Sequence, residues 1–252
     1  MRSAISKLAN TALFEQHPIL KYHLPETRLL TQETFIYMVR KYPFLYLKPD
    51  DSCQGKGIFQ LNSLQGHGFQ LISNDFQKAT VHHKLTKAFD QFLHLKMKRP
   101  YIIQQGVRSY TLNQSLFDIR VHLMRIEGDW KALGLVGRIA EKEEIVTNTC
   151  TRKGYKPVQY LFTKLLGYTQ KQSEIKKQQV SQIARLASFV MSSKHRTWHE
   201  LGIDIGVDHD RHIWIYESNV TPDTRVLNLL NEKLFHKVNR LRAIYHGNKQ
   251  YG

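Results

Sequence analysis

The segment at residues 213–224, with the sequence IWIYESNVTPDT, constrains the fold more than any other stretch of the chain. Apolar residues alternate from Ile213, which predicts a strand, and Pro222 marks its end. Because strand side chains repeat every two residues, Glu217 and Asn219 are expected to point to the same side. Two oxygen donors side by side at the end of a strand suit Mg²⁺, which takes few protein ligands and fills its other positions with water and phosphate.

A second short strand precedes this segment. Residues 202–207 read GIDIGV and hold one carboxylate, Asp204, among apolar residues. Asp204 is therefore an acidic residue on the predicted strand that precedes the one with the Glu217 and Asn219 donors. The local pattern leaves one alternative open, which is a hairpin whose acidic side chains only face water.

The length of 252 residues is enough for one large or two small domains with a buried core. A hydrophobic content of 41% and a charged content of 23% are typical of a soluble globular protein. No stretch reaches the ~20 apolar residues of a membrane-spanning helix, and the N-terminus lacks the apolar core of a secretory signal. The two cysteines, Cys53 and Cys150, give neither a disulfide framework nor a zinc pattern, so we expect a cytoplasmic protein.

The formal net charge is +16, from 37 basic and 21 acidic residues. Such a charge attracts polyanions, for example nucleotide phosphates, nucleic acid or acidic polymers. The basic residues are spread over many segments, and no nucleic-acid-binding motif accompanies them. We therefore interpret the charge as a solvated surface that suits an anionic substrate, and we disfavour a nucleic-acid partner.

Hydrophobic periodicity predicts helices and strands in an order without βαβ repeats, and therefore an α+β fold. The predicted helices cover residues 1–23, 31–41, 85–95, 175–192 and 226–245. The predicted strands cover residues 44–47, 58–61, 69–72, 101–105, 117–126, 131–140, 202–207 and 211–217. The clearest change in character comes near Gly106, where we expect one domain to end.

Lys48 ends a buried strand and is followed by a polar turn at residues 50–57, with the sequence DDSCQGKG. The turn is not a Walker loop, because the Gly-x-x-x-x-Gly-Lys-Ser/Thr spacing is absent. Its glycines nevertheless let backbone N–H groups approach an anion, and the lysine supplies a fixed positive charge. A plain hairpin with a lysine at its rim is the alternative.

Residues 102–107, with the sequence IIQQGV, join the two halves of the predicted fold. A connecting strand offers unpaired backbone N–H and C=O groups, which the edge of an adenine ring needs. An edge strand that runs into a linker explains the pattern equally well.

Acidic and basic residues alternate on the strand that follows. Asp118 and Arg120 lie on one face of it, and Arg138 lies on the next strand. Two arginines on adjacent strands can bind a phosphoryl group, whereas a structural Asp118–Arg120 pair is the alternative. The polar loop at residues 147–154, TNTCTRKG, suggests one more turn that faces a ligand.

The order of these signals resembles the ATP-grasp superfamily over residues 7–225. Three segments, YLKP at 46–49, FDIRVH at 117–122 and YESN at 216–219, resemble those of its endospore coat-associated YheC/YheD-like group. The resemblance implies an ATP-grasp fold, in which two α+β lobes hold ATP between them. It implies a helical segment at 1–25, a first lobe at 26–106 and a second lobe at 107–252, without the full N-terminal domain that usually precedes them.

The resemblance also implies a role for each candidate residue. Lys48, Arg120 and Arg138 would be catalytic, with Lys48 on the nucleotide phosphates and the arginines facing the transferred phosphoryl group. The metal site at Asp204, Glu217 and Asn219 would hold one or two Mg²⁺ ions. The other implied nucleotide-binding residues are Lys7, Gly55, Lys56, Gly57, Gln104, Gln105, Gly106, Val107 and Asn148. The family often has an acid where Gln105 stands, so a ribose or adenine contact is expected to differ.

The activity implied by the resemblance is that of a Mg²⁺- and ATP-dependent ligase. It would join a carboxylate to an amine, or less often to a thiol, through an acyl phosphate. The basic surface suits an anionic peptide or wall polymer as substrate, and the family implies spore-coat components as partners. Two alternatives remain: a structural spore-coat protein that keeps the fold without turnover, and a basic nucleic-acid-binding protein whose binding weakens with salt and needs no ATP.

Overall fold

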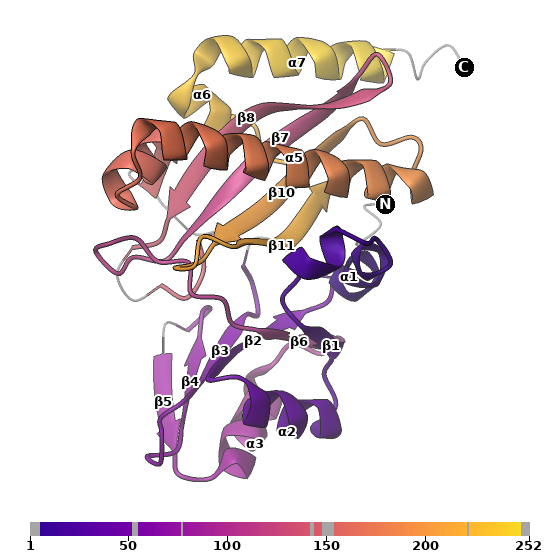
Figure 1. Cartoon of the computed structure of the whole chain (residues 1–252). Helices are drawn as coiled ribbons and strands as arrows, with labels where there is room; N and C mark the ends of the chain where they lie inside the picture. The colour runs from indigo at the N-terminus through magenta and orange to yellow at the C-terminus, as the bar shows by residue number, and fades with distance from the viewer. Residues whose placement is uncertain are drawn as a thin grey trace. The chain divides into compact units, whose positions relative to one another are not determined.

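The computed structural model of the chain describes residues 6–51, 55–76, 78–141, 144–147, 154–220 and 222–247 (Figure 1). The chain forms two compact units, and each is described by itself. The first unit comprises Met1–Arg108 and Ala140–Thr149, and the second unit comprises Ser109–Ile139 and Cys150–Gly252. The chain leaves the first unit after Arg108, close to Gly106, and returns to it for the short segment Ala140–Thr149. A single boundary near Gly106 therefore does not describe the division fully.

The first unit is built on a six-stranded antiparallel sheet. In the order of hydrogen-bonded neighbours its strands are β1 (Thr27–Leu29), β6 (Tyr101–Gln105), β2 (Phe44–Pro49), β3 (Phe59–Ser63), β4 (Phe69–Ser73) and β5 (Lys78–His82). Its helices are α1 (Lys7–Glu15), the short 3₁₀ helix η1 (Leu20–His23), α2 (Gln32–Lys41) and α3 (Leu85–Leu95). A capping box starts α2, because Thr31 and Thr34 each accept a hydrogen bond from the backbone N–H of the other.

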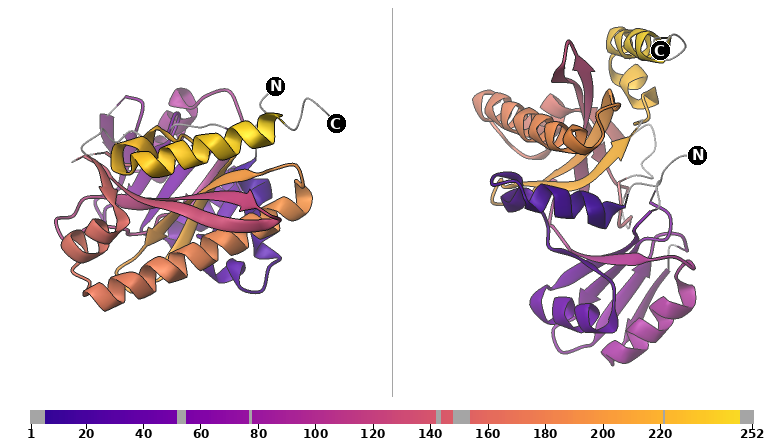
Figure 2. Two further views of the ribbon diagram at one scale, coloured as in Figure 1. Left: turned by 90° about the horizontal axis from the view of Figure 1, so that it is seen from above. Right: turned by 90° about the vertical axis from the view of Figure 1, so that its right-hand side faces the viewer.

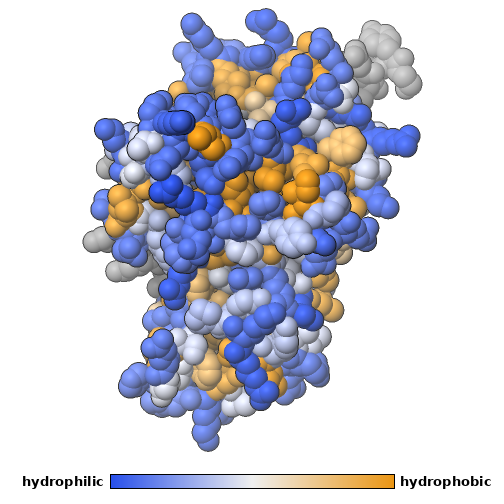
Figure 3. All heavy atoms as spheres, viewed as in Figure 1, coloured by the Kyte–Doolittle hydropathy of each residue, from blue (hydrophilic) through white to orange (hydrophobic). Residues whose placement is uncertain are grey.

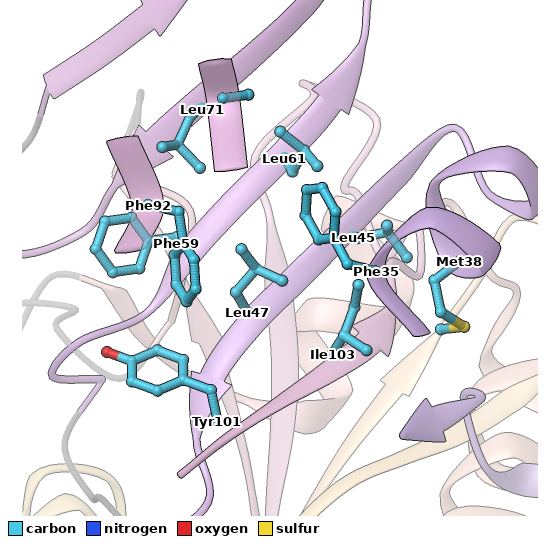
Figure 4. Close-up of a cluster of buried hydrophobic side chains, with 11 residues drawn as sticks. Phe35, Met38, Leu45, Leu47, Phe59, Leu61, Leu71, Phe92, Tyr101 and Ile103 are labelled. Atoms are coloured by element: carbon cyan, nitrogen blue, oxygen red, sulfur yellow. The ribbon is translucent and has the colours of Figure 1, made fainter. Parts of the chain in front are cut away.

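The two faces of this sheet pack against different parts of the unit. Leu47 of β2 packs with Phe35 of α2 and Phe92 of α3 in the main core, which Figure 4 shows. The preceding residue, Tyr46, points to the other face because strand side chains alternate. There it belongs to a smaller apolar cluster that includes Ile145, so residues from the returning segment help to cover the second face.

Gly57, in the turn between β2 and β3, is a position where only glycine fits. Its φ is +71°, and an added Cβ would lie 2.7 Å from Met97 Sδ and 2.9 Å from both Pro49 Cγ and Tyr101 Oη. We expect Gly57→Ala to lower the free energy of unfolding by about 3 kcal/mol, from the left-handed backbone and the overlap together. Denaturant unfolding of the purified variant measures this.

Gly66→Ala is the matched control for that substitution. Gly66 also has a left-handed φ, +90°, but an added Cβ would meet nothing within 4 Å. The control should therefore show only the backbone cost, about 1 kcal/mol. Equal losses in the two variants would show that the crowding at Gly57 is relieved by its neighbours.

The second unit is built on a five-stranded antiparallel sheet. In the order of hydrogen-bonded neighbours its strands are β11 (Ile213–Val220), β10 (Glu200–Val207), β7 (Phe117–Ile126), β8 (Asp129–Ile139) and β9 (Tyr155–Pro157). Its helical segments are α4 (Val158–Tyr160), the π-helical turn η3 (Leu161–Leu165), α5 (Gln170–Lys194), α6 (Arg225–Leu230) and α7 (Glu232–Gly247). The turn between β7 and β8 has two residues with positive φ, Glu127 and Gly128, as a tight hairpin requires.

Helices lie on both faces of this sheet (Figure 2). Helix α5 contacts β7, β8 and β10, and its residues Val180 and Ala184 are fully buried. On the opposite face, Val238 of α7 packs with Met124 of β7. Because side chains alternate along a strand, Met124 shares its face with Arg120, so α6 and α7 lie on the same face as the predicted site residues.

The structure confirms an α+β fold and differs from the predicted elements in a few places. It adds β1, β5, β9 and the helical turns at residues 158–165, which are short segments without a clear periodicity. The single helix predicted over residues 226–245 is wrong, because α6 and α7 are separated at Asn231. This residue is extended, and its side-chain oxygen accepts a hydrogen bond of 3.0 Å from the N–H of Leu234, as at the N-terminus of a new helix.

Hydrophilic side chains cover most of the face shown in Figure 3, as is usual for a soluble globular protein. Single apolar side chains such as Phe189 are exposed as well, which is normal for a protein surface. Among the helices in the described ranges, none is both long enough and apolar enough to span a membrane.

Candidate functional site

The three predicted metal ligands lie on one face of the second unit's sheet. Asp204 of β10 is directly opposite Glu217 of β11, and Gly202 is directly opposite Asn219. Residues opposite each other in an antiparallel pair point to the same face. The Asn219 amide nitrogen lies 3.2 Å from Asp204 Oδ2, and Glu217 is half-buried. The local strand pattern therefore brings these three side chains together as predicted.

The two predicted arginines lie beside these ligands, in what we call the acid–arginine cluster: Asp118, Arg120, Arg138 and Asp204. Arg120 donates to both carboxylate oxygens of Asp204, through Nε to Oδ1 and through Nη2 to Oδ2 at 2.9 Å. Arg138 donates through Nε to Asp118 Oδ1 at 2.6 Å and through Nη2 to Asp118 Oδ2. The same Nη2 lies 2.9 Å from Asp204 Oδ2, so the four groups form one connected set.

Burial and charge act in opposite directions on this cluster. Asp204 is only 2% exposed, and its burial alone would raise the pKa of the carboxyl, but the charges of Arg120 and Arg138 outweigh burial and lower that pKa. Burial would lower the pKa of Arg138, yet Asp118 and Asp204 raise it well above its usual value. Asp204 and Arg138 are therefore both charged, and the cluster holds an ionised carboxylate at a nearly dry position.

A second set of contacts, which the sequence did not predict, ties α7 to the same face of the sheet. Arg242 donates to both carboxylate oxygens of Glu200, at distances from 2.6 to 3.0 Å. It also donates to the carbonyl of Pro222 at 2.7 Å and to Thr224 Oγ1 at 3.1 Å. Glu200 Oε1 is 2.8 Å from Nε2 of the buried His122. This set fixes the chain just after β11, where the metal ligands end.

Glycine at position 202 keeps that segment close to the cluster. A Cβ at this position would lie 2.8 Å from Pro222 Cβ and 3.1 Å from Arg120 Cδ. The glycine in the GIDIG sequence indicates that another part of the chain packs closely here. The sequence does not reveal that the neighbours are Pro222 and Arg120.

In the first unit, two of the predicted nucleotide-binding residues, Lys48 and Gln104, are in contact. Lys48 Nζ donates a hydrogen bond of 2.7 Å to Gln104 Oε1, and Gln104 Nε2 donates one of 2.9 Å to Thr27 Oγ1. Lys48 Nζ also lies 5.0 Å from the centre of the Tyr46 ring. Gln104 is 4% exposed and Lys48 is half-buried, so the ammonium group has a fixed position at a partly open surface.

The prediction that residues 102–107 offer unpaired backbone groups is wrong for most of the segment. Strand β6 lies between β1 and β2, so it is not an edge strand. The N–H of Gln105 donates to the carbonyl of Glu26 at 2.8 Å, and the N–H of Gly106 donates to the carbonyl of Phe44 at 3.0 Å. Within the described part of the chain, the backbone N–H of Val107 has no hydrogen-bond partner, which leaves it as the candidate donor to a base.

The side chain of Glu26 lies at the same strand junction and carries a strongly shifted carboxyl group. It accepts hydrogen bonds of 2.7 Å from Lys41 Nζ, 2.7 Å from the Tyr42 hydroxyl and 2.6 Å from Arg28 Nε. Burial acts to raise the pKa of Glu26, but these donors outweigh it and lower the pKa to about 2. Gln105 Oε1 accepts a hydrogen bond of 3.1 Å from the backbone N–H of Glu26, so the Gln105 side chain helps to hold the segment before β1 against β6.

Most of the remaining nucleotide-binding candidates lie in the turn after β2, and Lys7 is the first residue of α1. The Lys7 backbone N–H lies 3.1 Å and its Nζ 3.4 Å from the Asp50 carbonyl oxygen. Gly57 N–H donates to Asp75 Oδ2 at 2.9 Å, and Gly55 accepts from the Asn74 amide at 3.1 Å. These bonds fix both glycines of the predicted phosphate lid. Lys56 between them is exposed, whereas Asn148 lies outside the described residues.

Comparison with known protein families gives a match over almost the whole chain. The family described as YheC/D like ATP-grasp matches residues 2–245. Endospore coat-associated protein YheD of Bacillus subtilis (strain 168) is 26% identical over 215 residues, which cover 83% of this chain and 46% of YheD. YheC of the same organism is 23% identical over 219 residues, 82% of this chain and 57% of YheC. The chain thus spans about half the length of these relatives.

Solved structures with a similar fold include several ligases and synthetases. The D-cycloserine synthetase DcsG has a TM-score of 0.59 at 11% identity, over 96% of this chain and 70% of that one. The D-alanine-D-alanine ligase from Coxiella burnetii has a TM-score of 0.52 at 12% identity, over 98% and 61%. N5-carboxyaminoimidazole synthase from Aspergillus clavatus, solved with ADP and 5-aminoimidazole ribonucleotide, has a TM-score of 0.52 at 15% identity, over 86% and 44%. At these identities the likeness concerns the fold.

Proposed function

Because the chain belongs to the YheC/D like ATP-grasp family, we propose that it is a Mg²⁺- and ATP-dependent ligase that joins a carboxylate to an amine or a thiol. Its fold is that of ATP-grasp proteins, and ligases are among the similar structures. The observation that carries the proposal is the placement of Asp204, Glu217 and Asn219 on one sheet face beside Arg120.

The donor set fits a divalent cation. Asp204 Oδ2 receives hydrogen bonds or ion pairs from Arg120, Arg138 and Asn219, whereas Oδ1 receives one from Arg120. A carboxylate oxygen offers about two lone-pair sites, so Oδ1 keeps capacity for a ligand that Oδ2 lacks. With Glu217 opposite and the Asn219 carbonyl oxygen on the same face, the site offers three hard oxygen donors, as Mg²⁺ prefers. The bound ion would neutralise charge on the transferring phosphoryl group.

The protein's own residues would bind and orient the nucleotide and stabilise the charge on the transferring phosphoryl group. Arg120 has the more open guanidinium of the two arginines, with 14% side-chain exposure against 6% for Arg138. We assign phosphoryl contact to Arg120 first, while Arg138 holds Asp118 and Asp204 in place. Lys48 would contact the nucleotide phosphates, and the Val107 N–H would donate to the base. Catalysis would rest on positioning and electrostatic stabilisation.

The proposed reaction has two steps and balances without any further reactant. A carboxylate oxygen of the first substrate forms a bond to the γ-phosphorus of ATP, and ADP leaves. The nitrogen of an amine then attacks the acyl carbon, inorganic phosphate leaves and the amine proton passes to solvent. The net charge of +16 suits an acidic peptide or wall polymer as substrate. Association with the spore coat is proposed from the names of the relatives.

Nucleotide binding is tested by thermal unfolding of the whole chain with ATP, with and without Mg²⁺. At an ATP concentration of about 100 Kd we expect Mg²⁺ and ATP together to raise Tm by roughly 5–10 °C. Lys48→Met should lose most of this rise, because it removes the ammonium group that Gln104 holds in place. Lys98→Met, at an exposed lysine of the same unit, is the control and should keep it.

Turnover needs its own measurement, because a coat protein that keeps the fold could still bind ATP. ADP release in the presence of candidate carboxylates and amines separates the two cases. If the chain binds Mg²⁺ and ATP but releases no ADP with any of the candidate substrates, the result would support a structural coat protein. No ATP-dependent rise in Tm, together with salt-sensitive binding to nucleic acid, would overturn the ligase proposal.

A further inference from the structure

We propose that the first unit carries a second binding site, for a small apolar carboxylate, in a pocket between α3 and the β4–β5 hairpin. The pocket has a volume of about 220 Å³. Its walls come from one helix, two adjacent strands and the turn between them: Leu71, Ser73, Phe76, Lys78, Thr80, Gln91 and Leu95. This inference goes beyond the proposed ligase function and does not depend on it.

The register of β4 against β5 explains why these side chains converge. Leu71 is directly opposite Thr80, and Ser73 is directly opposite Lys78, so all four point to one face. Gln91 and Leu95 are four positions apart on α3 and therefore lie on the same side of that helix. Leu71 is also a member of the main core and lies at one edge of it in Figure 4. The pocket thus adjoins the main core through Leu71.

Ser73 supplies the observation that points to a ligand. It is 4% exposed, and its hydroxyl oxygen has no hydrogen-bond partner within the described part of the chain. A buried hydroxyl without a partner destabilises the fold, so such groups are rare and their presence calls for a reason. The hydroxyl lines the pocket, where a bound acceptor oxygen would satisfy it.

The remaining walls define the chemistry of the occupant. Thr80 Oγ1 is already 3.4 Å from the Leu71 carbonyl oxygen, so it adds little. Leu71 and Leu95 offer apolar surface, and Phe76 adds an aromatic ring that is 60% exposed. Lys78 is exposed and places a positive charge at the pocket. An apolar group with a carboxylate therefore matches the pocket, and the volume exceeds the ~150 Å³ of an apolar cavity that accepts benzene.

This site is distinct from the candidate nucleotide residues. Leu71 and Leu47 belong to the core that faces α2 and α3. Lys48 follows Leu47 and, by strand alternation, points to the opposite face of the sheet. The pocket and the ammonium group of Lys48 thus lie on opposite faces of one sheet, and a single small ligand cannot contact both.

The test uses the full chain, labelled with ¹⁵N and ¹³C-methyl groups, and NMR titration with benzoate and its neutral counterpart benzyl alcohol. We expect benzoate to shift the resonances of Leu71, Thr80 and Leu95, with a Kd of about 1 mM, as befits so small a ligand. Lys78→Gln should weaken benzoate binding roughly 3-fold and leave benzyl alcohol unaffected, since a partly solvated charge pair contributes little. Lys98→Gln, the exposed-lysine control, should change neither.

Ser73→Ala distinguishes a ligand-binding hydroxyl from a structural one. It should weaken benzoate binding roughly 3- to 10-fold, by the loss of one hydrogen bond. It should not lower Tm in the absence of ligand, because it removes a buried group that has no partner. The proposal is overturned if neither probe shifts the lining residues, or if Ser73→Ala lowers Tm by several degrees and leaves binding unchanged.

Discussion

Replacement of Arg138 by methionine is expected to lower the free energy of unfolding by about 3–5 kcal/mol, the typical cost of breaking a buried ion pair. Arg138 is 5% exposed and its guanidinium contacts both Asp118 and Asp204. Methionine fills a similar volume but removes the arginine that binds the buried Asp118 side chain, and it removes one of the two charges that hold Asp204 ionised. Denaturant unfolding measures the loss.

Two further variants make this prediction specific. Arg240→Met changes an exposed arginine of α7 in the same unit and should cost less than about 0.5 kcal/mol. The double variant Arg138→Met/Asp118→Leu removes both members of the pair and should recover much of the loss, since a buried pair adds little beyond an apolar replacement. A double variant as unstable as the single one would show that Asp118 is not the group left uncompensated.

The double variant also separates stability from chemistry. If Arg138 acts only by holding the two carboxylates, the recovered protein should keep part of its Mg²⁺-dependent ATP binding, because Arg120 still contacts Asp204. If Arg138 itself contacts the phosphoryl group, the double variant should recover its stability but release no ADP in the turnover assay.

The parts of the site that sequence reasoning predicted are those that depend on local periodicity. Glu217 and Asn219 share a face because they are two positions apart on one strand. Asp204 joins them because β10 and β11 are neighbours along the chain. Lys48 and Gln104 were predicted as separate signals. Their contact depends on the pairing of β2 with β6, which brings together two residues 56 positions apart in the chain.

The ion pairs could not be predicted in the same way, because they depend on the register of distant strands. The sequence offered Asp118 and Arg120 as partners on one strand. The register instead places Asp118 opposite Arg138 on β8, and Arg120 opposite Asp204 on β10. Cross-strand neighbours are closer than residues two apart on the same strand, so the register decides which charges meet.

The prediction for residues 102–107 failed for a related reason. The short strand β1 has only three residues, too few for a recognisable alternation, yet it pairs with β6 along its whole length. That pairing occupies the second edge of β6 and explains why the Gln105 N–H is bonded to Glu26. Likewise, the ion pair of Arg242 and Glu200 joins residues 42 positions apart, and no local sequence pattern predicts it.

Glu217→Gln is expected to have the largest effect on nucleotide binding. The substitution keeps the size of the side chain and removes one negative charge from the three predicted metal ligands. A change in the groups that only support a metal ligand costs 10- to 100-fold in affinity, so loss of a charged ligand should weaken the dependence on Mg²⁺ by at least about 100-fold. The measurement is a Mg²⁺ titration of the ATP-induced rise in Tm.

The fold should tolerate this change, because Glu217 is half-buried and lies on a face that already carries balanced charges. Asp210→Asn, in the exposed turn between β10 and β11, removes the same charge a few residues away and should leave the titration unchanged. If Glu217→Gln kept the full Mg²⁺ dependence while Asp210→Asn lost it, the ion would be bound at the turn and not on the sheet face. If both variants kept it, Asp204 and Asn219 would have to hold the ion without Glu217, which two ligands at the end of a hairpin do only weakly.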